Sequence, residues 1–166
     1  MSTLPVIVRP VTLKDAAAVA AIYNHYVLHT VVTFEEEAIS TAEMKARIKE
    51  ITAVLPFFVA VEKGSVVGYA YANKWKSRCA YRFSVESTVY LAPAAAGRGL
   101  GTQLYTALLA ALRKLGRHGI IAGVALPNPA SVALHEKLGF AKIGHFKEVG
   151  WKQNQWIDVG YWELLL

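Results

Sequence analysis

Two features of this sequence could do chemistry: the carboxylate of Glu86 and a glycine-rich segment, residues 96–102. Glycines let the backbone come close to a ligand, and the free N–H groups of a following helical turn attract an anion. Arg98 adds a positive charge within this segment. Glu86 lies four residues before Tyr90 on a predicted strand, so both side chains leave the same face of the sheet. The pattern predicts a phosphate site beside an acid–base group.

Each of these features also has a simpler interpretation. Apolar neighbours are expected to raise the pKa of Glu86, which suits a general base near neutral pH, but a carboxylate at a strand edge can also pair with a nearby Arg or Lys. The glycine segment could be only a connection between a strand and a helix. No Gly-Lys-Ser/Thr follows it, as a P-loop requires, and it lies too late in the chain for a dinucleotide-binding fingerprint.

The elements that position these residues follow from hydrophobic periodicity, caps and turn residues. The predicted strands are residues 6–8, 57–61, 66–71, 85–91, 120–126, 141–149 and 157–165. The predicted helices are residues 16–27 after Thr12 as N-cap, a helix that begins at Ser40 or Thr41, residues 104–112, and a helix from Asn128 to Leu138 that ends at Gly139. The fold class is therefore α/β, a mixed central β-sheet flanked by α-helices, in a single domain over residues 1–166.

Composition excludes several classes of protein. Hydrophobic residues make up 54% of the chain, too many for a disordered protein. The net charge of +6 is compatible with an anionic ligand. The Lys and Arg residues are scattered along the chain and form no block of the kind that would indicate nucleic-acid binding. The lone Cys79 excludes an internal disulfide, and His25 and His29 lack a third ligand, so no metal is expected. The longest apolar runs are too short to span a membrane and no export signal is evident, so we expect a soluble, cytoplasmic protein.

Residues 96–101 resemble the Gln/Arg-x-x-Gly-x-Gly/Ala motif of the GNAT superfamily of N-acetyltransferases. Both motif glycines are matched, and Ala96 stands where the motif has Gln or Arg. Other segments resemble one branch, the phosphinothricin and methionine sulfoximine acetyltransferases: residues 22–24, 85–90, 134–140, 150–151 and 156–160. The resemblance covers nearly the whole chain. It implies the GNAT fold, in which the glycine-rich loop between the central strand and the next helix binds the pyrophosphate of acetyl-CoA.

The resemblance implies that the chain moves an acetyl group from acetyl-CoA to the amino group of a small amino-acid-like acceptor of the phosphinothricin, methionine sulfoximine or methionine sulfone type. Transfer would be direct, because no acyl-enzyme nucleophile is evident. Two alternatives stay open: a GNAT enzyme for another amine (a polyamine, an aminoglycoside or a protein amine), and a non-catalytic module that binds CoA or nucleic acid. The resemblance also implies a homodimer.

The implied site residues fall into three groups. Glu86 and His135 are the implied catalytic pair; His135 stands where many relatives have a tyrosine as general acid, and it could equally be a structural hydrogen-bonding group. The implied cofactor-binding residues are Val89, Tyr90, Leu91, Gly97, Arg98, Gly99, Leu100, Gly101, Thr102 and Asn128. The implied acceptor-binding residues are Phe34, Lys76, Arg78, Arg82, Glu86, Ser87 and Thr88. The basic residues among them could instead form a solvated surface loop.

Overall fold

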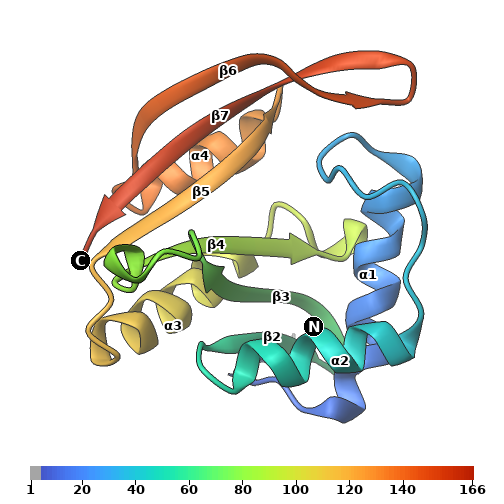
Figure 1. Ribbon diagram of the computed structural model, residues 1–166. Helices are drawn as coiled ribbons and strands as arrows, with labels where there is room; N and C mark the ends of the chain where they lie inside the picture. The colour runs from blue at the N-terminus through green and yellow to red at the C-terminus, as the bar shows by residue number, and fades with distance from the viewer. Residues whose placement is uncertain (1–4) are drawn as a thin grey trace.

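A mixed seven-stranded sheet forms the middle of the molecule in the computed structural model, which describes residues 5–166 (Figure 1). The strands are β1 (Ile7–Pro10), β2 (Phe57–Glu62), β3 (Ser65–Lys74), β4 (Ser84–Leu91), β5 (Gly119–Leu126), β6 (Ala141–Lys152) and β7 (Gln155–Leu165). Their order across the sheet is β1-β2-β3-β4-β5-β7-β6. Of the strand pairs in the described part of the chain, β4 and β5 run parallel and every other neighbouring pair is antiparallel.

Helices cover both faces of this sheet. They are α1 (Ala16–His29), α2 (Thr41–Thr52), α3 (Leu100–Lys114) and α4 (Pro129–Lys137). Val59 and Tyr69 pack with α1 and α2, whereas the neighbouring Ala60 and Ala70 pack with α3. Because successive strand residues point to opposite faces, α1 and α2 cover one face and α3 covers the other, and apolar residues of α4 join the α3 core. The predicted α/β class is confirmed.

Local signals explain where the helices begin and end. Ser40 accepts the Glu43 N–H at 3.2 Å while the Glu43 carboxylate accepts the Ser40 N–H, which is a capping box at the start of α2. Asn128 caps α4, and Gly139 follows it with a φ of 91°. The predicted N-cap of α1 is wrong: Thr12 is the N-cap of a 3₁₀ turn, Leu13–Asp15, and Asp15 is the N-cap of α1. The predicted helices and strands are all present, and β3, β6 and β7 extend beyond the predicted ranges.

The parallel pair at the centre is short. β4 and β5 are paired only from Ser84 to Glu86, opposite Gly119 to Ile121, and then they diverge. β4 stays paired with β3 up to Leu91, so beyond Glu86 only its β5-facing edge lacks a neighbouring strand. A strand edge without a partner offers N–H and C=O groups to a ligand.

Candidate active site

A cleft of about 620 Å³ opens where β4 and β5 diverge. Residues 86–91 of β4 form one wall and residues 123–125 of β5 form the other. The glycine-rich loop and the first turn of α3 close one end, and α4 contributes Ser131, Leu134 and His135. The two features that the sequence singled out therefore line the same cavity.

The glycine-rich loop presents backbone groups to this cleft. Gly97 and Gly99 have φ values of 74° and 77°, a left-handed conformation that strains any other residue. Gly99 is the N-cap of α3 and supplies no side-chain cap, so the first N–H groups of the helix stay available. Gly101 and Thr102 line the cleft beside them. This end of the cavity fits a phosphate group.

Two residues of the same loop point elsewhere. The Arg98 guanidinium pairs with the Glu62 carboxylate through both of its terminal nitrogens, and it does not line the cleft. Leu100 is buried in the core under α3. The Arg98 charge is therefore paired with Glu62. The backbone N–H groups of the loop are the donors that suit a phosphate.

The remaining predicted cofactor contacts lie on the edge of β4 and at the start of α4. Val89, Tyr90 and Leu91 all line the cleft on the strand's unpaired side. The Tyr26 hydroxyl donates a hydrogen bond of 2.6 Å to the Leu91 carbonyl and so supports this edge from α1. Asn128 faces the cleft from the opposite wall, where its side-chain oxygen accepts the Ser131 N–H at 3.1 Å. Asn128 therefore acts as a helix cap within the cavity.

Glu86 lies partly buried in the cleft wall. Burial raises the pKa of its carboxyl group, and the positive charge of Lys76 opposes that shift. Among residues 5–166, no Lys, Arg or His nitrogen lies within ion-pair distance of this carboxylate. The alternative of a structural ion pair therefore finds no support, and a carboxylate with a raised pKa suits a general base.

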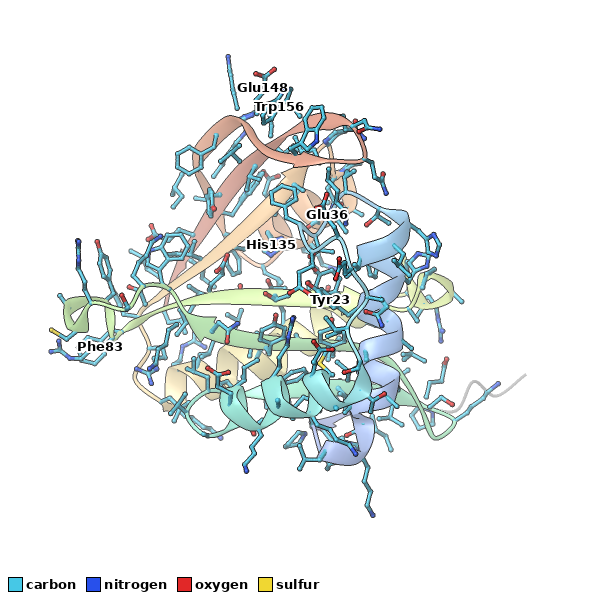
Figure 2. The ribbon with its side chains drawn as sticks, turned by 45° about the vertical axis from the view of Figure 1, so that its right-hand side comes forward. Tyr23, Glu36, Phe83, His135, Glu148 and Trp156 are labelled. Atoms are coloured by element: carbon cyan, nitrogen blue, oxygen red, sulfur yellow. The ribbon has the colours of Figure 1, made fainter. Side chains whose placement is uncertain are left out.

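His135 is held in a buried chain of hydrogen bonds, in the middle of the molecule (Figure 2). Its Nδ1 lies 2.7 Å from the Ser131 carbonyl and its Nε2 lies 2.7 Å from the Tyr105 hydroxyl, which in turn lies 3.0 Å from the Ser87 hydroxyl. A carbonyl only accepts, so Nδ1 carries the proton and Nε2 accepts from Tyr105. Burial lowers the pKa of His135, which keeps the ring neutral near pH 7.

A neutral imidazole with both nitrogens bonded has no free N–H for the cleft. This geometry favours the structural alternative for His135, and its role as a proton donor stays a prediction. Tyr105 lies between His135 and Ser87, and all three line the cleft.

The predicted acceptor residues divide between two pockets. Glu86, Ser87 and Thr88 line the cleft. Lys76, Arg78 and Arg82 line a second pocket of about 270 Å³, which shares no lining residue with the first. Phe34 lines neither pocket; its ring packs so closely on Gly150 of β6 that a Cβ there would lie 2.4 Å from it.

Sequence reasoning missed three residues around Glu86 and His135. Tyr105 lies in the apolar stripe of α3, so the sequence pattern marked it as a core residue. Its hydroxyl group, a polar group at a core position, was the one feature that could have singled it out. Gly123 brings β5 close: a Cβ there would lie 3.6 Å from Glu86 Oε1 and 3.2 Å from the Tyr161 ring. Burial and the nearby Glu86 raise the pKa of Tyr161. Tyr161 comes from β7, and no local pattern could place it beside Glu86.

Comparison with known proteins assigns the family. The model of the acetyltransferase (GNAT) domain matches residues 8–160. The chain belongs to the GNAT family. A phosphinothricin N-acetyltransferase of Streptomyces viridochromogenes is 41% identical to this GNAT chain, over 96% of the chain and 87% of its own length. An L-methionine sulfoximine/L-methionine sulfone acetyltransferase of Salmonella typhimurium is 37% identical, over 92% of the chain and 90% of its own length.

Solved structures agree. The crystal structure of a GNAT phosphinothricin acetyltransferase from Sinorhizobium meliloti, in complex with acetyl-CoA, matches with a TM-score of 0.94 and 38% identity. The match covers 98% of this chain and 89% of that one. This GNAT protein is an acetyl-CoA-dependent N-acetyltransferase.

Two further findings concern the part of the chain that the structure describes. None of its helices has the length and apolar character needed to cross a membrane. No three His, Cys, Asp or Glu side chains within residues 5–166 gather closely enough to hold a metal ion.

Proposed function

We propose that this enzyme acetylates the amino group of a small amino-acid-like acceptor of the phosphinothricin, methionine sulfoximine or methionine sulfone type. One observation supports this proposal above the others: the Glu86 carboxylate, with its raised pKa, lies in the same cleft as the unpaired N–H groups of α3 and β4. The relatives that share about 40% of their residues with the chain carry these acceptors in their names.

Acetyl-CoA, when bound, supplies an acetyl group on a thioester carbon. The N–H groups at the start of α3 hold its diphosphate, and the edge of β4 at Val89–Leu91 holds its arm and the thioester oxygen. Glu86, directly or through a water molecule, takes a proton from the acceptor's ammonium group, so that the nitrogen lone pair is free to attack the thioester carbon. The new C–N bond replaces the C–S bond, and coenzyme A leaves as a thiolate that takes up the second proton lost by the amine. Cys79 is exposed and lines only the second pocket, which supports direct transfer without an acyl-enzyme.

The charge of the cleft bears on the choice of amine. Among residues 5–166, Glu86 is the one carboxylate that lines the cleft, and Lys137 lines it as well. A polyamine or an aminoglycoside carries several positive charges and needs several carboxylates for binding, whereas a zwitterionic amino acid does not. This balance favours the amino-acid class over the cationic amines.

The test is a thiol-release assay with acetyl-CoA and a panel of amines. We expect turnover with phosphinothricin, methionine sulfoximine or methionine sulfone to exceed turnover with spermidine, kanamycin and a lysine peptide by at least about a hundredfold in kcat/KM. Faster release with any of the cationic amines would assign the enzyme to that class instead. No release with any amine, despite acetyl-CoA binding, would support the non-catalytic alternative.

A further inference from the structure

A buried ammonium group joins the β6–β7 hairpin to the α1–α2 loop, residues 30–40. Lys152, at the end of β6, is 3% exposed, and its Nζ donates a hydrogen bond of 2.8 Å to the Thr33 carbonyl. The loop rises from α1 toward the hairpin in both views of the molecule (Figure 1, Figure 2). Lys152 therefore holds the middle of this loop against β6.

The burial of this ammonium group is costly, and the structure compensates it weakly. Lys152 forms no ion pair in the described part of the chain. Burial lowers the pKa of its ammonium group, and the negative charge of Glu36 in the same loop opposes that shift. An apolar side chain of the same length would avoid the loss of hydration, so stability alone does not account for a lysine here. What the lysine adds is a fixed position for the carbonyl that it binds.

An aromatic contact holds the same part of the loop. The Phe34 ring lies over Gly150, two residues before Lys152, and a Cβ at Gly150 would lie 2.4 Å from it. The absence of a side chain at Gly150 thus lets the loop approach β6 closely enough for Lys152 to reach the Thr33 carbonyl.

The second half of the loop is attached to the helices. The Glu35 carboxylate pairs with the Arg47 guanidinium of α2 at 2.8 and 3.1 Å. The Asn24 side chain of α1 bonds both the N–H and the carbonyl of Ile39 at 2.9 Å. Lys152 and Gly150 therefore complete the attachment at the one part of the loop that reaches the hairpin.

That part of the loop forms a wall of the active-site cleft, which residues 32 and 33 line. The Thr33 hydroxyl lies 3.0 Å from the Tyr23 hydroxyl, and the Tyr23 ring meets the Tyr90 ring edge to face. Tyr90 leaves β4 on the same face as Glu86, whereas the residues on either side of Tyr90 pack with the α3 core on the other face. The loop is thus on the side of Glu86, opposite the helix that presents its N–H groups to a phosphate.

We propose that Lys152 is a positioning residue for acetyl transfer: it holds residues 32 and 33 in the wall of the cleft where the acceptor binds beside Glu86. The inference rests on the proposed function, in which the acceptor's amino group lies at Glu86. Lys152 lines neither pocket, so it acts through the backbone of Thr33.

The first experiment measures the kinetics of Lys152→Met, which keeps the length of the side chain and removes its ammonium group, with the amine that the wild type uses best. We expect the KM of the acceptor to rise at least about tenfold, while kcat stays within about threefold and the Kd of acetyl-CoA is unchanged. The melting temperature is expected to stay equal or to rise, because a buried charge is lost. Lys152→Arg keeps an N–H donor and is expected to restore part of the KM. The control is Lys49→Met, at an exposed position of α2, with wild-type kinetics.

A matched pair of glycines tests the same attachment without changing any charge. Gly150→Ala puts a Cβ against the Phe34 ring, whereas Gly144→Ala, on the same strand, puts a Cβ where no atom lies within 4 Å. We expect Gly150→Ala to raise the KM of the acceptor and Gly144→Ala to leave it unchanged. This pair decides the matter if Lys152→Met does not fold. An unchanged KM in Gly150→Ala and in any folded Lys152→Met overturns the proposal, and so does an equal rise in the controls.

Hydrogen–deuterium exchange separates this proposal from the proposed function, because it needs no turnover. We expect the amides of residues 31–37 to exchange at least about tenfold faster in Lys152→Met and Gly150→Ala than in the wild type and in Gly144→Ala. Unchanged exchange overturns the proposal even in an active enzyme. Faster exchange in a protein whose wild type acetylates no amine refutes the proposed function and, with it, the role of Lys152 in transfer, while the attachment of the loop stands.

Discussion

At the residue scale, the proposed chemistry depends on the protonation state of Glu86. Glu86→Gln keeps the size of the side chain and removes its ability to take a proton. We expect kcat to fall by about a hundredfold or more while the Kd of acetyl-CoA, measured by calorimetry, stays nearly the same. Glu50→Gln, at an exposed position of α2, is the control and is expected to leave both values unchanged. A Glu86→Gln enzyme with wild-type activity across the pH range would contradict the assigned role.

Lys76 gives a second test of the same carboxylate. A base must be ionised, so activity is lost as the pH falls through the pKa of Glu86. Burial raises this pKa and Lys76 lowers it, so Lys76→Met leaves the effect of burial unopposed. The acidic limb of the kcat/KM profile is therefore expected to move to higher pH. Lys74→Met, two residues earlier on β3, is expected to leave the limb where it is; an unmoved limb in Lys76→Met would contradict the argument.

At the scale of the elements, the loop between β4 and α3 can be tested with a matched pair of glycines. Gly99 and Gly64 have φ values of 77° and 80°, and a Cβ at either would meet no atom within 4 Å. Alanine at either position therefore costs a similar backbone strain, about 1 kcal/mol of unfolding free energy. We expect Gly99→Ala to weaken acetyl-CoA binding, because it disturbs the N–H groups of α3, and Gly64→Ala to keep full affinity. Equal affinities in calorimetry would make the loop a plain connection.

Local signals predicted the elements well because caps and turn residues act within a few positions. As the sequence predicted, α2 begins after Ser40 and α4 begins after Asn128. Gly139, with its positive φ, follows the end of α4. The divergence of β4 and β5, which creates the cleft, depends on strand pairing between distant segments and left no local trace.

The side-chain contacts around the site also join residues that are far apart in the sequence. Arg98 was expected to face the ligand, but its partner Glu62 lies 36 residues away in the sequence. Arg117 joins the basic run of residues 74–82 only because the turn after α3 meets the start of β4. Sequence patterns could name the cations, and only the tertiary structure could sort them into two pockets.

At the scale of the whole molecule, the two edges of the sheet differ. β1 is four residues long and ends at Pro10, which cannot donate a hydrogen bond to another strand. β6, at the other edge, is twelve residues long, and the β6–β7 hairpin projects from the body with Trp156 near its tip (Figure 2). Large apolar side chains are exposed along this hairpin: Ile143, Phe146, Val149, Trp151 and Trp156. Such a surface marks an interface, and we propose that a second copy of the chain covers it.

Sedimentation velocity tests this assembly. We expect the wild type to sediment as a dimer at micromolar concentration and the double variant Trp151→Ser/Trp156→Ser to sediment as a monomer. Each tryptophan is more than half exposed in the single chain, and the two rings meet edge to face with their centroids 4.9 Å apart. Leu115→Ser, at an equally exposed position outside the hairpin, is the control and is expected to stay dimeric. Circular dichroism checks that the double variant is folded. A monomeric wild type would contradict the homodimer and leave the hairpin for a different protein partner.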